Sequence, residues 1–248
     1  MKHGKLYLSL FQLCLLGAIT TAFTPIPARA QSGSYMSFDF PGANKTIASG
    51  ISPAGDIAGS YFDANGKNHG FLLAGGEFTA IDFPGAPASN AIGINPGGDI
   101  VGAYLISGVE VHGFLLAGGQ FTTIDVPGAT LTFAFGISPG GDIVGAYSGA
   151  DRRPHGLLLS AGQFTAIYFP GAVDTNALGI NPRGDIVGAY EDADLKTHGF
   201  LLSGGQFTSI DFPGASSTTA LGINARGDIV GHYDRADAKI HGFLLSKQ

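Results

Sequence analysis

A unit of 43 residues runs five times through this chain of 248 residues, with no insertion or deletion between successive copies. Strict self-similarity at such a period is typical of propellers, solenoids and arrays, in which one unit cannot bury its apolar face alone. Three short signatures mark the units. The His-Gly-Phe triplet (His-Gly-Leu once) begins at His69, His112, His155, His198 and His241; the Pro-Gly pair begins at Pro41, Pro84, Pro127, Pro170 and Pro213; and the Gly-Asp-Ile triplet begins at Gly55, Gly98, Gly141, Gly184 and Gly227.

Residues 176–212 illustrate how one unit is expected to fold. Four segments rich in apolar, β-branched and aromatic side chains predict strands at residues 176–181, 186–190, 198–202 and 207–212. A turn with Pro182 and a position of positive φ at Gly184 joins the first two strands, and Gly204-Gly205 joins the last two. Residues 31–248 show no helical periodicity. Each unit therefore predicts a four-stranded antiparallel sheet.

Radial repetition of four-stranded sheets at this period predicts a β-propeller. We expect an all-β, five-bladed β-propeller with repeats at about residues 36–77, 78–120, 121–163, 164–206 and 207–248. Residues 35–40 match the fourth strand of the other units, whereas the chain ends shortly after a third strand at residues 241–245. The N-terminal strand is thus expected to join the C-terminal blade and close the ring, which removes the need for capping repeats. An open β array is the alternative.

Residues 1–30 have the features of a secretory signal peptide. Lys2 and Lys5 precede an apolar run at residues 6–23, and Ala28-Arg29-Ala30 fits a small-x-small cleavage site. Cleavage after Ala30 would leave residues 31–248 as a single domain, secreted or periplasmic, with no membrane span; an uncleaved anchor is the alternative. The one cysteine, Cys14, lies in the removed run, so the mature chain would have no thiol.

The charge balance argues against a nucleic-acid partner. Three of the 13 basic residues and none of the 19 acidic ones lie in residues 1–30, so cleavage changes the net charge from −6 to −9 with histidines neutral. Nucleic acids and anionic membrane surfaces select basic faces. No His-Glu-x-x-His motif occurs, and residues 31–248 contain no cysteine, so the sequence predicts no cofactor, no metal and no catalytic residue. The domain is expected to be a monomer.

The two ends of the predicted blades differ in variability. If the first strand lies innermost, the tight turns after strands one and three share one end, and they vary little between units. The loops between strands two and three and the connections between blades share the other end and vary most, as residues 62–68 and 191–197 illustrate. Variable loops on a rigid scaffold are the usual place for binding residues, so we expect function at that end.

The repeat motif resembles a known family. The pattern His-Gly-Phe-Leu-Leu, followed by Gly-Ile-Asn-x-x-Gly-Asp-Ile-Val-Gly, is similar to the bacterial extracellular repeats of the HAF family over residues 36–248. The family has a His-Ala-Phe triplet, and here glycine stands in place of its alanine; the Ile-Asp-Phe-Pro-Gly segment also differs, which indicates a sub-type. The resemblance implies an exported, propeller-like protein and implies no activity.

Five Tyr–His pairs are the candidate ligand-binding residues. In each unit a tyrosine ends the second strand and a histidine begins the third, eight residues later. One interpretation is five equivalent pockets; the other is that each pair closes its loop by hydrogen bonds, because a residue present in every unit is more simply needed by the blade itself. A metal ring of five histidines is disfavoured, because strand three lies too far from the axis. The pairs are Tyr61 with His69, Tyr104 with His112, Tyr147 with His155, Tyr190 with His198, and Tyr233 with His241.

Two sets of aspartates also recur. One set follows the turn glycine in every unit and is interpreted as turn and cap residues: Asp56, Asp99, Asp142, Asp185 and Asp228. The other set clusters in the loops between strands two and three. No loop has the full spacing of a calcium motif, so a solvated acidic rim is the interpretation and calcium the alternative. Its members are Asp63, Asp151, Asp192, Asp194, Asp234 and Asp237.

The third unit departs from the others. Val126 and Leu157 replace phenylalanine, Tyr168 replaces aspartate, and Phe133 and Phe135 replace polar or aliphatic residues. Repacking at constant volume explains these exchanges, because cores tolerate such swaps. An apolar ligand contact near Phe133 is the alternative.

Three classes of function remain. An exported, non-enzymatic binding module for a glycan, a similar polar ligand or a cell-envelope component fits the equal loop lengths, since matched sites suit avidity. The lack of tryptophan counts against sugar stacking, although tyrosine could substitute. A structural or envelope-associated protein with no small ligand fits equally well. A hydrolase or lyase at the central channel would need one unit with unique polar residues on its first strand, and no unit shows them convincingly.

Overall fold

All the regular structure in the described part of this chain is β-structure. The computed structural model describes residues 36–106, 110–236 and 239–246, and it contains no helix in those ranges. Contacts divide the chain into residues Met1–Ser37 and residues Phe38–Gln248, and every strand lies in the second unit. The predicted signal peptide, residues 1–30, lies outside the described residues.

In the described ranges, nineteen strands follow the 43-residue period, and we number the repeats by them. Repeat 1 contains β1 (Lys45–Ile51), β2 (Ile57–Phe62), β3 (Asn68–Ala74) and β4 (Glu77–Ile81). Repeat 2 contains β5 (Ala88–Ile94), β6 (Ile100–Leu105), β7 (Val111–Ala117) and β8 (Gln120–Ile124). Repeat 3 contains β9 (Leu131–Ile137), β10 (Ile143–Ser148), β11 (Pro154–Ser160) and β12 (Gln163–Ile167). Repeat 4 contains β13 (Asp174–Ile180), β14 (Ile186–Glu191), β15 (Thr197–Ser203) and β16 (Gln206–Ile210), and repeat 5 contains β17 (Ser217–Ile223), β18 (Ile229–Asp234) and β19 (Ile240–Leu245).

Each repeat is an antiparallel meander in chain order. The strands form four sheets, because one parallel pair, Val111 with Leu131, joins the meanders of repeats 2 and 3 into a sheet of eight strands. The prediction of four strands per unit is confirmed for repeats 1 to 4, and the expected strands of residues 176–212 coincide with β13 to β16. Gly184 has a φ of 79°, as the turn after the first strand requires.

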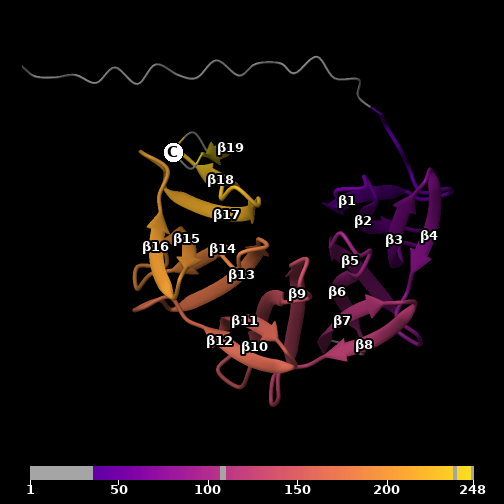
Figure 1. The fold of residues 1–248 in the computed structure, drawn as a ribbon, viewed down its shortest axis with the longest axis horizontal. Coiled ribbons are helices and arrows are strands. Elements are labelled where there is room, and N and C mark those ends of the chain that lie inside the picture. Colours follow the sequence, from indigo (N-terminus) through magenta and orange to yellow (C-terminus); the bar gives the residue numbers. More distant parts are fainter. Residues whose placement is uncertain (1–35, 107–109, 237–238, 247–248) are drawn as a thin grey trace, which may run out of the picture. The chain divides into compact units, whose positions relative to one another are not determined.

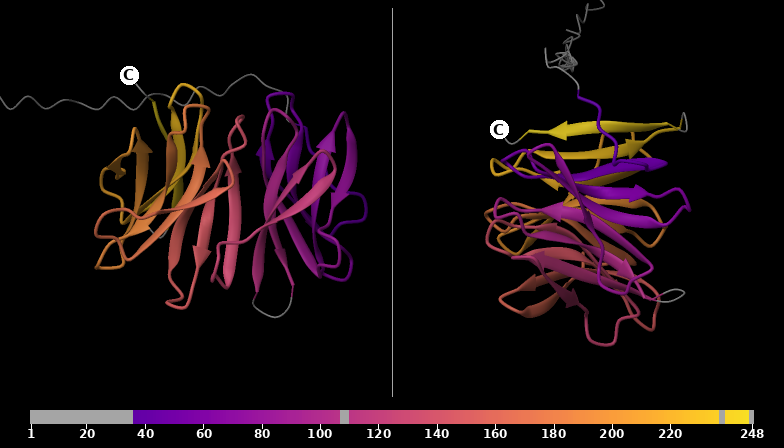
Figure 2. Two further views of the ribbon diagram at one scale, coloured as in Figure 1. Left: turned by 60° about the horizontal axis from the view of Figure 1, so that its bottom comes forward. Right: turned by 90° about the vertical axis from the view of Figure 1, so that its right-hand side faces the viewer.

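The first strand of each repeat lies innermost, as expected. Successive first strands contact one another from β1 through β5, β9 and β13 to β17, and the fourth strands lie on the outside (Figure 1). The strands run from one end of the unit to the other, with the connections gathered at those two ends (Figure 2). We call the end with the connections between strands two and three, and between repeats, the loop end; the opposite end is the turn end.

A glycine in the second strand fixes how each sheet packs. Gly188 on β14 faces the carbonyl oxygen of Asn176 and the ring of Phe200, and a Cβ there would clash with the carbonyl and approach the ring to 2.8 Å. The Phe200 ring is completely buried over this glycine. Phe71 and Phe114 are also completely buried, each over the corresponding glycine of its own repeat. The glycine is therefore required for packing, which sequence reasoning missed because glycine also fits a turn-rich composition.

The predicted ring closure is not observed in this structure. Residues Met36–Phe40 carry no strand, and β17, β18 and β19 form a three-stranded sheet within the described residues. Phe40 stacks on Tyr61 of repeat 1, with ring centroids 3.6 Å apart. The stack itself is the one that joins the other repeats, because Phe212 stacks on Tyr233 in the same way after β16 has paired within repeat 4.

The two terminal repeats expose residues that the inner repeats bury. Val230 of β18 is 49% exposed, whereas the equivalent Val101, Val144 and Val187 are completely buried. On the other side, Ala48 of β1 is exposed, whereas the equivalent Ala91, Ala134, Ala177 and Ala220 are completely buried. Repeat 5 therefore exposes the face that repeats 2 to 4 pack against the repeat that follows them. Repeat 1 exposes the complementary face, which the later repeats pack against the repeat that precedes them.

Candidate functional site

The Tyr–His pairs lie at the loop end, on neighbouring positions of two strands. In repeat 4, Tyr190 of β14 pairs with His198 of β15 across the antiparallel ladder, and their rings stack with centroids 5.0 Å apart. The same register joins the other four pairs, because the tyrosine and the histidine are eight residues apart in every repeat. Their centroid distances run from 4.9 Å for Tyr61 with His69 to 5.4 Å for Tyr104 with His112.

A phenylalanine covers the other face of the tyrosine in four repeats. Phe169, from the connection before repeat 4, stacks on Tyr190 with centroids 3.6 Å apart and planes 4° apart. Each tyrosine ring is thus held between a phenylalanine and a histidine, and Tyr190 is only 9% exposed. The remaining stacks are Phe40 on Tyr61, Phe83 on Tyr104, and Phe212 on Tyr233. The tyrosine rings therefore serve chiefly as packing groups.

The histidines are hydrogen-bonded to aspartates that sequence reasoning had not assigned to them. Nδ1 of His198 donates to Oδ1 of Asp211 at 2.6 Å, just after β16. His69 with Asp82 (2.9 Å) and His112 with Asp125 (2.6 Å) repeat the arrangement. A signal was present in the sequence, because each aspartate follows its histidine by 13 residues. Strands three and four pair antiparallel across a tight turn, so that spacing brings the two side chains together.

His198 makes a second hydrogen bond, which gives repeat 4 the most complete network. Its Nε2 donates to Asp192 at 3.0 Å, in the loop after β14. Burial lowers the pKa of His198, but the hydrogen bonds to Asp211 and Asp192 raise it more, so that its pKa lies above the usual range. Burial raises the pKa of Asp211, and the hydrogen bonds from His198 and Ser209 overcome this and lower it. The imidazolium and carboxylate forms are therefore both favoured.

Repeat 3 contains a different arrangement. Tyr168 stands where the others have aspartate, and its hydroxyl lies 3.0 Å from the hydroxyl of Tyr147. His155 donates from Nε2 to Asp151 at 2.7 Å instead. Val126 replaces the covering phenylalanine, and the Tyr147 and His155 rings are tilted by 47°. Burial and the hydrogen bond to Tyr168 raise the pKa of Tyr147 to about 12.

The acidic loop residues act mainly through the backbone of their own loops. Oδ1 of Asp192 accepts from the backbone N–H groups of Asp194 and Lys196, and Asp63 does the same for Asn65 and Lys67. These are Asx turns, which hold the loop shape. Within the described ranges, no group of three or more His, Cys, Asp or Glu side chains is arranged to hold a metal ion. Asp237 lies outside the described residues.

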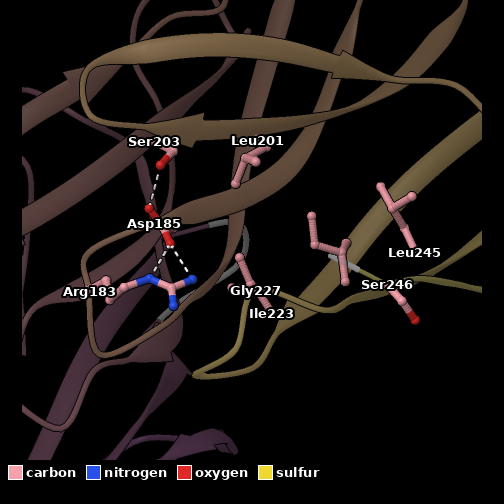
Figure 3. A pocket seen from close by; sticks show the side chains of 9 residues that line it. Arg183, Asp185, Leu201, Ser203, Ile223, Gly227, Leu245 and Ser246 are labelled. Atoms are coloured by element: carbon pink, nitrogen blue, oxygen red, sulfur yellow. Dashed lines mark hydrogen bonds and ion pairs between the residues drawn. The ribbon is translucent and has the colours of Figure 1, made fainter. Parts of the chain in front are cut away.

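The aspartates at the turn end are structural, as predicted. Asp185 accepts hydrogen bonds from Ser203, Asn181 and Arg183, and Arg183 also donates to the backbone oxygen of Ala225 in repeat 5. A hollow of about 240 Å³ lies beside this network, between repeats 4 and 5 (Figure 3). The side chains of Arg183, Asp185 and Ser203 point toward one another, and Leu201, Ile223 and Leu245 add apolar lining.

Two hollows lie between repeats 2 and 3. The larger, of about 490 Å³, is lined by Glu110, Thr130, Leu131, Ser148 and Arg152 at the loop end. The smaller, of about 100 Å³, has a lining that includes Asn90, Tyr104, Val111 and Phe133. Phe133 thus lies at the surface of a hollow, stacked on Phe135 with centroids 5.7 Å apart. Of the five predicted tyrosines, Tyr104 is the one that reaches one of these hollows.

Comparison with known proteins shows the fold. No family model matches the chain, and no curated protein matches its sequence. A fucose-specific lectin from Aleuria aurantia is similar in structure, with a TM-score of 0.51 and 13% identity over 81% of this chain and 73% of that one. The β-propeller domain of the Trilobed protease from Pyrococcus furiosus, described as having an open velcro topology, has a TM-score of 0.56 and 10% identity over 83% and 68%. TolB from Acinetobacter baumannii has a TM-score of 0.56 and 15% identity over 82% and 55%.

At these identities the likeness concerns the fold alone. The chain has an all-β fold similar to β-propellers, among which are lectins. In the part of the chain that the structure describes, no helix has the length and hydropathy needed to cross a bilayer.

Proposed function

We propose that the protein is a non-enzymatic binding module that holds a glycan through polar groups at the loop end of its repeats. The observation that carries the proposal is the repeated pairing of a histidine with an aspartate whose carboxylate faces solvent. In repeat 4, the side chain of Asp211 is 48% exposed while that of His198 is 13% exposed. A carboxylate held in place by a histidine is a preorganised acceptor for sugar hydroxyl groups.

The repetition of the pair supports multivalent binding. Equivalent His–Asp pairs occur in repeats 1, 2 and 4 at one end of the molecule, so several residues of a branched or polymeric glycan could be engaged together. Linked sites convert weak individual contacts into avidity. A fold shared with fucose-binding lectins supports the same class of ligand.

A glycan array with matched variants tests this proposal. The wild-type protein is expected to bind a subset of immobilised glycans, and the Tyr190→Ala/His198→Ala double variant is expected to lose most of that signal. Glu77→Ala, which removes an exposed carboxylate at the turn end of repeat 1, is the control and should bind like wild type. Equal binding by the double variant and the wild type, with both folded by circular dichroism, would refute the role of the pairs.

A structural role without a small ligand is the second candidate function. The burial of Tyr190 between Phe169 and His198 favours it, since the stack itself stabilises the loop end. A blank array from a folded protein would support this role.

We also propose that the five repeats form a closed five-bladed ring, in which the N-terminal segment matched to a fourth strand, residues 35–40, completes the sheet of repeat 5. The complementary exposure of Val230 and Ala48 supports closure, because equivalent residues are buried at every inner junction. Leu201 pairs with Thr208 in repeat 4, and the equivalent residues are Leu244 and Met36. Cysteines at positions 36 and 244 should therefore form an intramolecular disulfide. Free thiols after mild oxidation, or a disulfide between two chains, would contradict closure.

Export and membership of the HAF repeat family are likewise proposals. The character of residues 1–30 supports export, and the repeat signature supports membership. Fractionation of cells that express the full chain, with mass spectrometry of the mature N-terminus, would test export: Gln31 is the expected first residue.

A further inference from the structure

The junction between repeats 2 and 3 differs from its neighbours in the residues that line it. Glu110 comes from repeat 2, just before β7, while Thr130, Leu131, Ser148 and Arg152 come from repeat 3. They surround the hollow of about 490 Å³ at the loop end. Binding cavities for small molecules commonly measure roughly 300–1,000 Å³. The hollow therefore has the size of a small-ligand site.

Both charged side chains of the hollow are available to a ligand. Within the described ranges, neither the carboxylate of Glu110 nor the guanidinium of Arg152 takes part in a hydrogen bond or ion pair. The surrounding backbone is nevertheless fixed: the N–H of Arg152 donates to the oxygen of Gly149, and the hydroxyl of Thr130 donates to the oxygen of Ser148. The hollow thus offers one hydrogen-bond acceptor, the carboxylate of Glu110, and one hydrogen-bond donor, the guanidinium of Arg152, beside backbone that is held by hydrogen bonds.

The lining residues break the internal symmetry of the chain at this one junction. At the position of Glu110, the other repeats have Lys67, Arg153, Lys196 and Lys239, which are all basic. At the position of Arg152, repeats 1 and 4 have Gly66 and Leu195. Residues needed by the scaffold recur in every repeat, as the histidines and turn aspartates do. Glu110 and Arg152 do not recur at the equivalent positions, so the needs of the scaffold do not explain them.

Apolar surface lies next to the charged groups. Leu131 lines the larger hollow, and it pairs with Val111, which lines the smaller one. Phe133 follows on the same face of β9, where the other repeats have Asn90, Asn176, Thr219 and Ile47. The junction therefore combines an anionic acceptor, a cationic donor, two hydroxyl-bearing residues and an aliphatic side chain within one cavity.

We infer that this junction is a separate site for one neutral pyranose residue, with Glu110 accepting from and Arg152 donating to the ring hydroxyl groups. The inference rests on the proposal that the protein binds glycans, and it adds a site distinct from the repeated His–Asp pairs. A pyranose has hydroxyl groups that act as both donors and acceptors and a C–H face that packs on Leu131. Charged groups make stronger hydrogen bonds to hydroxyl groups than neutral groups do.

The chain itself suggests variants that keep the fold. Arg152→Gly installs the residue that repeat 1 has at this position, and both sites have positive φ, 58° for Arg152 and 79° for Gly66. Glu110→Lys installs the residue of repeats 1 and 4. Arg153→Ala is the matched control, because it removes the same charge one residue away from the hollow.

Isothermal titration of the full protein with a set of neutral methyl pyranosides, including methyl α-L-fucoside, tests the inference. We expect the tightest site to bind one pyranoside per chain, and Arg152→Gly and Glu110→Lys each to weaken it by about tenfold or more, in line with the loss of a charged hydrogen bond. Arg153→Ala should bind like wild type.

Three results would overturn the site. Unchanged binding by Arg152→Gly and Glu110→Lys, with loss only in the Tyr190→Ala/His198→Ala variant, would assign binding to the repeated pairs and leave the proposed function standing. Binding of free glycine or betaine, but of no pyranoside, would replace the saccharide with a zwitterion. Binding of neither class, together with a blank glycan array, would refute this site and the proposed function together.

Discussion

Repeats 3 and 4 have the same backbone but different chemistry at the loop end. In repeat 4, Tyr190 is stacked between Phe169 and His198, and His198 bridges Asp192 and Asp211. In repeat 3, Val126 leaves Tyr147 without that stack, and Tyr168 bonds to the tyrosine rather than to the histidine. The strand register is nevertheless the same, with Tyr147 opposite His155 as Tyr190 is opposite His198.

The comparison separates what the scaffold needs from what the surface can vary. Strand pairing depends on the backbone and on the buried glycine, which both repeats keep as Gly145 and Gly188. The phenylalanine stack and the bond from the histidine to the aspartate after the fourth strand are additions that one repeat can lose. Repeat 3 has lost them beside the junction where Glu110 and Arg152 appear, so the departure from symmetry and the proposed pyranose site coincide.

The largest expected loss of stability comes from replacing the glycines of the second strands. Gly188→Ala would place a methyl group against the carbonyl of Asn176 and the Phe200 ring, so we expect a loss of about 3 kcal/mol of unfolding free energy. Gly145→Ala meets the carbonyl of Phe133 but has no ring among its nearest atoms, because Leu157 replaces the phenylalanine. Urea denaturation should rank Gly188→Ala as the more damaging change. The reverse order would show that the ring does not restrict this position.

The next largest effect on stability is expected at the phenylalanine that stacks on the tyrosine. Phe169→Val should cost about 1–2 kcal/mol, since it removes apolar area and the stack on Tyr190. Val126→Phe gives repeat 3 the cover that the other repeats have, and we expect it to stabilise by about 0.5–1 kcal/mol. Thermal unfolding of both variants checks the pair. Destabilisation by Val126→Phe would mean that the space over Tyr147 is already filled.

The smallest expected effect is the pH dependence of the His198 network. A raised histidine pKa contributes stability that is fully present below the unfolded pKa, about 6.5, and is lost as pH rises through the folded value. The lowered pKa of Asp211 contributes stability that is present above about pH 4 and is lost as pH falls through the folded value. The pair should therefore stabilise most between about pH 4 and 6.5.

Denaturation of wild type and His198→Gln across this range measures the contribution. We expect a difference of about 1 kcal/mol near pH 5, narrowing by pH 8, because glutamine retains a hydrogen-bond donor but does not titrate. A difference that does not change with pH would mean that the network acts through packing alone.

The repeat made much of the fold predictable from the sequence. Residues 176–212 predicted the four strands of repeat 4 and the turn at Gly184, because alternating side chains and turn glycines are local signals. The Tyr–His pairing across β14 and β15 followed from the same register. Local patterns are reliable here because every unit repeats them.

The rest depended on contacts between strands or repeats. Asp211 was not identified as the partner of His198, since that pairing needs the geometry of β15 and β16. Ring closure was expected from the match of residues 35–40 to a fourth strand, and within the described residues β17 to β19 form a three-stranded sheet. The hollow at Glu110 and Arg152 was missed, because its residues come from two repeats and each looks like loop variation in one unit.

Hydrogen exchange in the presence and absence of an array-selected glycan tests the central claim, glycan binding at the loop end, most directly. We predict slower exchange at that end, near His198 and Asp211 and strongest beside Glu110 and Arg152, with no change in the turn at Asn181 and Asp185. Slower exchange confined to the turn end, or no change anywhere at saturating glycan, would contradict the account.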